Sequence, residues 1–129
     1  MIWIIIWIMF VHWIADFVLQ TEEMTNKKSS SNFWLTMHVS VYSLTSLGGI
    51  MIYGIFYLYG HDTLELGSMF IVFFVLCFVL HWLTDFVTSR ITTYYHITKQ
   101  TRKFFITIGF DQWLHLIQLL SIYFYLRIL

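Results

Sequence analysis

The sequence predicts an all-α fold, a four-helix transmembrane bundle built from two duplicated helical hairpins. Three observations support this prediction: the chain is strongly apolar, its apolar residues form four long stretches, and a seven-residue motif is present twice. Hydrophobic residues make up 59% of the 129 residues, and charged residues only 11%. A soluble domain of this size could not bury so much apolar surface, so the composition favours a membrane protein.

The four apolar stretches lie at residues 2–20, 34–58, 68–88 and 104–126. Each is close to the roughly 20 residues that a helix needs to cross a bilayer. Helices satisfy their own backbone hydrogen bonds in hydrocarbon, and these runs are too long and too unalternating for barrel strands. We therefore expect one integral membrane domain over residues 1–129. The first stretch has no basic segment before it and no small-residue cleavage site after it, which predicts a retained helix rather than a signal peptide.

The basic residues predict the orientation of the bundle. Six of the seven Lys and Arg residues lie in the first and third connections, residues 21–33 and 89–103, and none lies in the second, residues 59–67. By the positive-inside rule the first and third connections face the cytoplasm, and both termini lie on the outer side. The net charge of zero gives no support for a nucleic-acid partner, so the lipid bilayer is the expected partner.

The repeated motif places ionisable side chains inside apolar stretches. HWIADFV at residues 12–18 returns as HWLTDFV at residues 81–87, with five of seven residues identical. The spacing of His12 from Asp16, and of His81 from Asp85, stacks each pair on one face of a helix. Ionisable groups in such surroundings are functional candidates because they are costly to keep. The two copies also predict an internal repeat of two hairpins, residues 1–58 and 68–129.

Three further polar residues are expected at the same depth. His38 begins the second stretch, and Asp111 and His115 lie early in the fourth. An up-down-up-down bundle would bring residues from all four helices together in its cytoplasmic half, which is how helix bundles build metal sites. The candidate metal ligands are His12, Asp16, His38, His81, Asp85, Asp111 and His115.

Charge balance favours metal at this predicted cluster. Three buried carboxylates are strongly destabilising without positive charge, and no Lys or Arg is expected at this depth. Two divalent ions and one hydroxide would neutralise the three aspartates. Mixed imidazole and carboxylate ligands suit Zn²⁺, Mn²⁺ or Fe²⁺ better than Ca²⁺. The side chains expected to orient these ligands are Gln20, Tyr42, Ser89 and Gln112. His61 and His96, which fall in connections, are not expected to be ligands.

The leading functional hypothesis is a divalent-metal-dependent hydrolase that acts on a lipid or lipid-linked phosphate at the cytoplasmic leaflet. The metal would activate water, and Asp16, Asp85 or Asp111 would serve as general base. One alternative is a metal-free proton relay. Another is a non-catalytic scaffold, for instance a phage-encoded modifier of the host membrane, whose His/Asp cluster fixes helix packing. A third is a subunit of a small transporter or channel, with a homo-oligomer completing the pathway.

The polar motifs together resemble those of a known family. Residues 12–21, His38, residues 81–90 and residues 109–115 resemble the domain-of-unknown-function 3307 family, small multi-helix membrane proteins of bacteria and their phages. The resemblance covers nearly the whole chain in order. It implies a membrane location and a polar His/Asp set, and it implies no particular activity. The expected location is the bacterial inner membrane.

Overall fold

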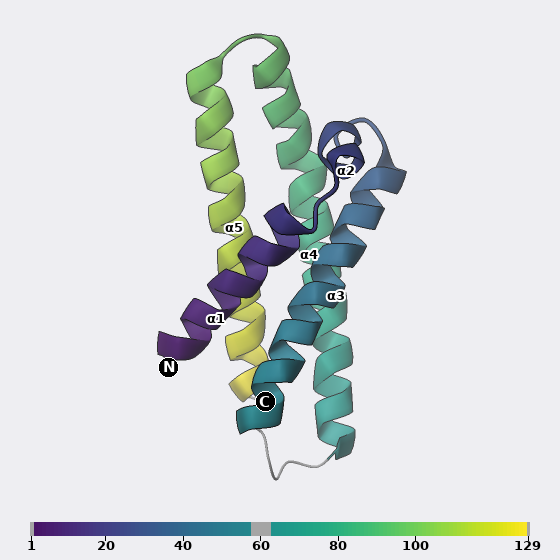
Figure 1. Ribbon diagram of the computed structural model, residues 1–129, viewed down its shortest axis with the longest axis vertical. Coiled ribbons are helices and arrows are strands. Elements are labelled where there is room, and N and C mark those ends of the chain that lie inside the picture. Colours follow the sequence, from purple (N-terminus) through teal and green to yellow (C-terminus); the bar gives the residue numbers. More distant parts are fainter. Residues whose placement is uncertain (1, 58–62, 129) are drawn as a thin grey trace.

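The computed structural model describes residues 2–57 and 63–128, and this part of the chain consists of helices joined by short connections, with no strand (Figure 1). The all-α prediction is therefore confirmed. The elements in chain order are α1 (Ile2–Trp13), the π-helical turn η1 (Ile14–Val18), α2 (Glu22–Lys27), α3 (Asn32–Tyr57), α4 (Thr63–Ile97) and α5 (Thr101–Ile128).

Three long helices form the body of the molecule, and the N-terminal helix crosses it. In Figure 1, α3, α4 and α5 run lengthwise beside one another, whereas α1 lies obliquely across them. The short helix α2 and the turn between α4 and α5 lie toward the same end, and both chain termini lie toward the other. The two predicted basic connections thus lie at one end of the bundle.

The first apolar segment is shorter than the sequence predicted. α1 contributes 12 residues and η1 contributes 5, and at about 1.5 Å per residue they span about 25 Å, less than the roughly 30 Å of a hydrocarbon core. Among the described residues, three helices are long and apolar enough to cross a membrane by length and composition, over Asn32–Gly54, Gly67–Ile97 and Thr101–Leu126. The prediction of long apolar helices is therefore confirmed for three of the four stretches, and the first stretch forms a shorter apolar helix beside them.

Two further features differ from expectation, namely the end of α4 and an additional short helix. α4 continues to Ile97 rather than ending at residue 88, because residues 89–97 contain neither Gly nor Pro to stop it. The helix ends where Lys99 takes a left-handed backbone conformation with φ of 56°. The first connection contains α2, which the sequence analysis did not predict. Thr21 caps α2 by accepting a hydrogen bond from the Met24 amide at 3.3 Å.

The apolar core and the polar side chains occupy different levels of the bundle. The core includes Ile4 and Ile8 from α1, Phe73 from α4, and Leu119 and Ile122 from α5. Along their helices, these residues lie nearer than the two HWxxDFV motifs to the end of the bundle that carries the chain termini. The level nearer α2 holds buried histidines and aspartates instead. The bundle therefore has a buried polar cluster near α2 and an apolar core nearer the chain termini.

The two copies of the motif do not have the same local structure. The second copy lies within the continuous helix α4, whereas the first copy runs from α1 into η1, where the Leu19 amide bonds to the Ile14 carbonyl five residues earlier. A π-helical turn carries an extra residue per turn, so side chains after it rotate relative to those before it. The expected internal repeat of two hairpins stays a prediction.

A close approach between α1 and α3 generates a first prediction. A Cβ on Gly49 would lie 2.7 Å from both γ-carbons of Val11, whereas a Cβ on Gly48 would meet nothing within 4 Å. Gly49→Ala should therefore lower the free energy of unfolding by about 1–3 kcal/mol. Gly48→Ala should be neutral or raise it by up to about 1 kcal/mol, because alanine favours helix. Thermal unfolding of both variants in detergent checks this, and equal melting temperatures would contradict it.

Candidate metal centre

All seven predicted ligand residues lie at the polar level of the bundle. α1 and η1 bring His12 and Asp16, and α3 brings His38. The remaining four come from α4 (His81, Asp85) and α5 (Asp111, His115). Six of the seven are buried, and Asp111 is partly exposed. The structure thus brings side chains together from residues as far apart in sequence as 12 and 115.

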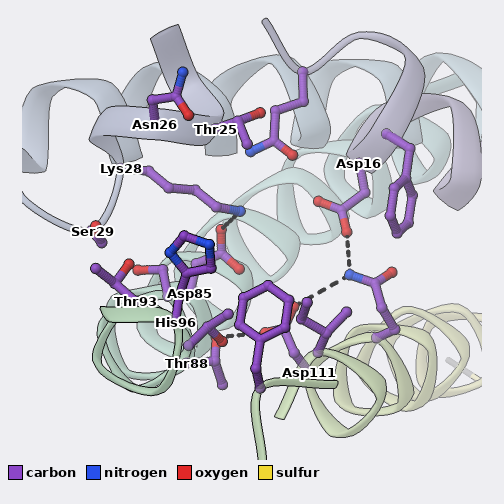
Figure 2. A pocket seen from close by; sticks show the side chains of 17 residues that line it. Asp16, Thr25, Asn26, Lys28, Ser29, Asp85, Thr88, Thr93, His96 and Asp111 are labelled. Carbon is purple, nitrogen blue, oxygen red and sulfur yellow. Dashed lines mark hydrogen bonds and ion pairs between the residues drawn. The ribbon is translucent and has the colours of Figure 1, made fainter. Parts of the chain in front are cut away.

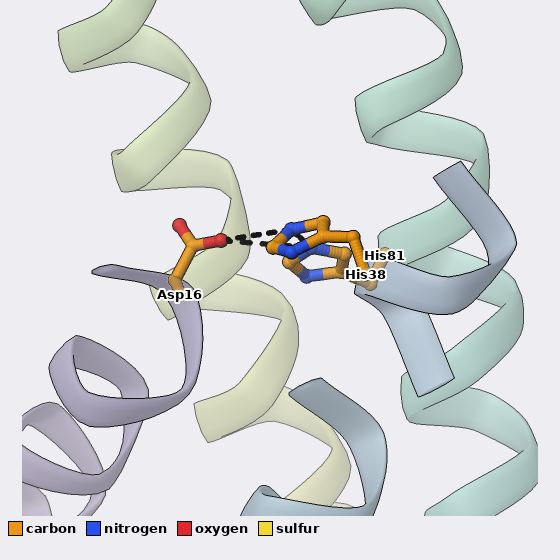
Figure 3. Close-up of side chains that lie close together, drawn as sticks. All are labelled: Asp16, His38 and His81. Atoms are coloured by element: carbon orange, nitrogen blue, oxygen red, sulfur yellow. Dashed lines mark hydrogen bonds and ion pairs between the residues drawn. The ribbon is translucent and has the colours of Figure 1, made fainter. Parts of the chain in front are cut away.

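One group of possible ligands consists of Asp16, His38 and His81 (Figure 3). His38 Nε2 lies 3.1 Å from Asp16 Oδ1, and His81 Nε2 lies 3.9 Å from the same oxygen. The two Nε2 atoms are 3.3 Å apart. A tetrahedral ion with bonds of about 2.0–2.1 Å holds its ligands about 3.3 Å apart. The three atoms therefore have the spacing of three ligands around one ion.

The hydrogen bonding of this group also fits an ion. Within the described part of the chain, the buried Oδ1 of Asp16 has no hydrogen-bond partner, although His38 lies close to it. The two histidine nitrogens face each other, so without an ion one of them must carry a proton to bond to the other. An ion between the three atoms would satisfy the orphaned oxygen and both nitrogen lone pairs together.

A second group, His81, Asp85 and His115, has poorer geometry for an ion. His115 Nε2 lies 3.0 Å from Asp85 Oδ1, and His81 Nε2 lies 3.7 Å from Asp85 Oδ2. However, the rings of His81 and His115 are stacked, with centroids 3.9 Å apart and planes only 17° apart. The lone pair of an imidazole nitrogen lies in the ring plane, so nearly parallel rings do not direct their lone pairs at one point. The rings of His38 and His81, at 56°, are better placed to converge.

Asp111 supports this second group without belonging to it. Its Oδ1 lies 3.2 Å from His115 Nε2 and accepts a hydrogen bond of 2.5 Å from the Thr88 hydroxyl. His115 therefore sits between the carboxylates of Asp85 and Asp111. This arrangement fixes the ring of His115 and, through it, one oxygen of Asp85.

His12 lies beside the ligand groups rather than in either of them. Its Nδ1 is 2.9 Å from the Tyr42 hydroxyl, and its Nε2 is 3.0 Å from Gln112 Oε1. Gln112 in turn donates to Asp16 Oδ2 at 2.7 Å. The π-helical turn between His12 and Asp16 gives the physical reason, because it changes their relative direction, whereas regular helix keeps His81 and Asp85 together. His12 thus orients Asp16 through Gln112.

Lys28 is the charged residue of the cluster that sequence reasoning missed. The expectation that no Lys or Arg reaches this depth is wrong, because α2 folds back and places Lys28 Nζ 2.8 Å from Asp85 Oδ2. Burial alone lowers the pKa of Lys28, but the carboxylates of Asp85 and Asp16 more than offset it and raise that pKa above its ordinary value. Lys28 is therefore an ammonium ion. Because Lys28 lies in a polar connection, nothing in the sequence indicates that its side chain points into the bundle.

The other side chains expected to orient ligands are placed as follows. Tyr42 and Gln112 both contact His12. With its amide turned to satisfy both neighbours, Gln20 donates to the Asp16 carbonyl at 2.8 Å and accepts from Lys28 at 3.2 Å. Ser89 lines a cavity instead, but its hydroxyl oxygen is buried and has no hydrogen-bond partner among the described residues. His96 lines the same cavity, and His61 lies outside the described residues.

That cavity adjoins the cluster and has a volume of about 440 Å³. Its lining includes Asp16, Lys28, Asp85 and Asp111, and it extends between α2 and the hairpin of α4 and α5 (Figure 2). Pockets of about 300–1,000 Å³ are typical of small-molecule sites. A ligand in this cavity would touch the carboxylates of the cluster directly.

Comparison with known proteins places the chain in a family. A family model described as "Protein of unknown function (DUF3307)" matches residues 4–128. The chain belongs to this family. The match includes every residue of the candidate centre, and the predicted resemblance is thereby confirmed. No curated protein and no solved structure matches the chain. The bacterial and phage membrane setting that the resemblance implied stays a prediction.

The buried ion pair of Lys28 generates a second prediction. In metal-free protein, Lys28→Met leaves the Asp85 carboxylate buried without its ammonium partner and should lower the free energy of unfolding by about 3 kcal/mol. Because the pKa of Lys28 is raised in the folded state, its contribution should be complete at neutral pH and be lost only as the pH rises through that raised pKa. Thermal unfolding measured at neutral and alkaline pH checks both statements.

The matched control is Lys27→Met. Lys27 Nζ lies 5.1 Å from the centre of the Trp34 ring at the surface, a contact that contributes less than about 1 kcal/mol. Equal losses in the two variants would show that the Lys28 ion pair has no special role.

Proposed function

We propose that this chain is a membrane-embedded protein that binds a divalent metal ion between Asp16, His38 and His81. The spacing of these three ligand atoms, close to that around a tetrahedral ion, is the observation that carries the proposal. Three protein ligands leave a fourth position open, as catalytic sites do and structural sites do not. Imidazole and carboxylate ligands suit Zn²⁺, Mn²⁺ or Fe²⁺.

The buried charges support one ion rather than two. Asp16, Asp85 and Asp111 carry three negative charges, and Lys28 supplies one positive charge that the sequence analysis did not count. With the histidines neutral, a single divalent ion brings the total to zero. Two ions would need two further negative charges in the same space.

The surface of the bundle supports a location in a bilayer. Large apolar side chains are exposed on the outside, including Ile71 at 67% and Phe105 at 64% exposed, whereas His38 and Asp85 are almost fully buried. Extended apolar surface of this kind needs a membrane or a partner to cover it. We place the end that carries α2 and the turn between α4 and α5 at the cytoplasmic face, because most of the basic residues lie there.

Labelling tests this orientation. Cysteines introduced as Ser30→Cys and Lys99→Cys should resist a membrane-impermeant maleimide in intact cells and react after permeabilisation. The native Cys77 is buried and should give little background. Efficient labelling from outside would reverse the proposed orientation.

Removal of the metal tests whether the protein binds an ion. Chelation should lower the stability of the purified protein, by about 2.7 kcal/mol relative to free ion at 100 times its Kd, and restoring the ion should recover it. Asp16→Asn should reduce the bound metal measured by elemental analysis to a small fraction. Glu23→Gln is the control, since Glu23 is an exposed carboxylate on α2.

A packing role without metal predicts different results. Lys28 contacting Asp85 is the observation that favours such a scaffold, because the pair neutralises one carboxylate by itself. A purely structural cluster would show no metal in elemental analysis, no effect of chelator, and no difference in metal content between Asp16→Asn and Glu23→Gln.

We further propose that the centre hydrolyses a lipid or lipid-linked phosphate. A bound divalent ion would polarise a phosphoryl oxygen and make water more acidic. Asp85 Oδ2 lies 3.3 Å from His38 Nε2, one of the proposed ligand atoms, so this carboxylate would be close enough to an ion-bound water to accept a proton from it. His115 and Lys28 hold the two oxygens of Asp85, and Asp111 holds His115.

Turnover is the test of this activity. Metal-replete protein should release phosphate or a headgroup from a panel of lipid phosphates, and Asp85→Asn should reduce kcat by at least about 100-fold while the ion stays bound. Metal content measured on the same sample separates loss of a base from loss of the ion. If metal-loaded protein hydrolyses none of the lipids in the panel, the proposed activity is wrong and only the proposal of metal binding stands.

A further inference from the structure

The side-chain amide of Gln112 contacts two carboxylates of the cluster. Its Nε2 donates to Asp16 Oδ2 at 2.7 Å and lies 3.3 Å from Asp111 Oδ2. Ionised carboxylates only accept hydrogen bonds, so the NH₂ end of the amide has to face them. The carbonyl end then faces His12, whose Nε2 lies 3.0 Å from Gln112 Oε1. The two carboxylates therefore fix which way the amide of Gln112 points.

The direction of this amide determines where His12 carries its proton. A carbonyl oxygen only accepts, so the bond to Gln112 Oε1 requires a proton on His12 Nε2. In the part of the chain that the structure describes, no carboxylate contacts the His12 ring to hold a second proton, so the ring is neutral. Its bare Nδ1 accepts from the Tyr42 hydroxyl at 2.9 Å. Tyr42, His12 and Gln112 thus form a hydrogen-bond chain, each donating to the next, and the chain ends on Asp16 Oδ2.

The hydrogen-bond chain leaves one oxygen of Asp16 available to an ion. Asp16 Oδ2 is bonded to Gln112, whereas Oδ1 is the oxygen that lies nearest to His38 and His81 (Figure 3). This Oδ1 is buried and, among the described residues, has no hydrogen-bond partner. An ion between the three side chains would therefore take one ligand atom from Asp16, and not two.

The carboxylate of Asp85 is also held by partners of its own. His115 Nε2 lies 3.0 Å from Asp85 Oδ1, and the Lys28 ammonium donates to Asp85 Oδ2 at 2.8 Å. Asp85 Oδ2 lies only 3.3 Å from His38 Nε2, but it would have to give up the ammonium to bind the ion. With these contacts kept, the protein supplies three ligand atoms, and a water molecule can complete a set of four.

The spacing of the three ligand atoms also favours four ligands over six. Two imidazoles and one carboxylate also bind octahedral Fe²⁺, where ligands at about 2.1–2.2 Å and about 90° lie roughly 3.0 Å apart. Around a tetrahedral ion the same atoms lie about 3.3 Å apart. The measured separations are 3.1, 3.3 and 3.9 Å, so their average is nearer to the tetrahedral value.

We propose that Gln112 makes the candidate centre selective for Zn²⁺, because it keeps Asp16 to one ligand atom and so keeps the ion to four ligands, with water as the fourth. Zn²⁺ is commonly held by four ligands, whereas Mn²⁺ and Fe²⁺ favour octahedral sites. The choice of ion rests on the proposed function, since it needs an ion between Asp16, His38 and His81. The direction of Gln112 and the proton on His12 rest on hydrogen bonds of the protein alone.

Cobalt(II) bound to the full chain in detergent tests the number of ligands. Protein stripped by chelator and reloaded with Co²⁺ should show the intense visible absorption of an ion with four ligands. Gln112→Leu frees Asp16 Oδ2 to turn toward the ion, so its Co²⁺ absorption should weaken to that of a higher coordination number. The same variant should lose about tenfold of the preference for Zn²⁺ over Mn²⁺, measured by competition between the two ions.

The matched control is Gln118→Leu, on the same helix. The Gln118 amide donates to the Thr84 hydroxyl at 2.7 Å and not to a carboxylate, so this variant should keep the Co²⁺ spectrum and the metal preference of the unmodified protein. Equal effects of the two substitutions, or no effect of Gln112→Leu, would overturn the role of Gln112. The spectrum of the unmodified protein needs no variant, and weak absorption typical of six ligands there would overturn the zinc preference.

The proton on His12 is tested without any metal. Nitrogen-15 NMR of chelator-treated protein, with the His12 signals assigned by their loss in His12→Gln, should show a protonated Nε2 and a bare Nδ1. A proton on Nδ1, or on both nitrogens, would overturn the hydrogen-bond chain. If the chain is present but elemental analysis finds no ion, the proposed function and the zinc preference are both wrong. An ion bound with six ligands contradicts the zinc preference alone and leaves the proposed ion binding intact.

Discussion

The buried carboxylates of Asp16 and Asp85 are the constraint on which the rest of the structure depends. A carboxylate held among apolar helices is tolerated only with positive charge or several hydrogen-bond donors beside it. The fold supplies these from every direction: imidazoles from α3, α4 and α5, an ammonium from α2, and an amide from α5. The oblique path of α1 and the folding back of α2 both serve to bring these partners to one level.

The two copies of one motif show how local backbone geometry changes the role of identical side chains. His81 and Asp85, on regular helix, both reach the candidate centre. His12, before a π-helical turn, contacts Tyr42 and Gln112 instead, while Asp16 reaches the centre alone. π-helical turns within helices are frequent at functional sites, where they redirect a side chain. Here the π-helical turn directs His12 away from the candidate centre, and His12 instead orients the ligand Asp16 through Gln112.

The candidate centre and the cavity belong to one arrangement. Asp16, Lys28, Asp85 and Asp111 belong to the cluster and also line the cavity, so whatever enters the cavity meets the charged groups directly. Lys28 contacts Asp85 from the cavity side, which makes the short helix α2 both a wall of the cavity and a source of charge for the cluster.

The sequence by itself determined the helical class, the apolar stretches and the set of seven polar side chains, because length, hydropathy and i, i+4 spacing are local properties of the chain. It missed the inward Lys28, the extra helix α2, the extension of α4 and the altered role of His12. These were decided by tertiary structure. Whether a lysine in a polar connection points outward or into a cluster depends on which carboxylates lie within reach, and only the packed helices bring residues 28 and 85 together.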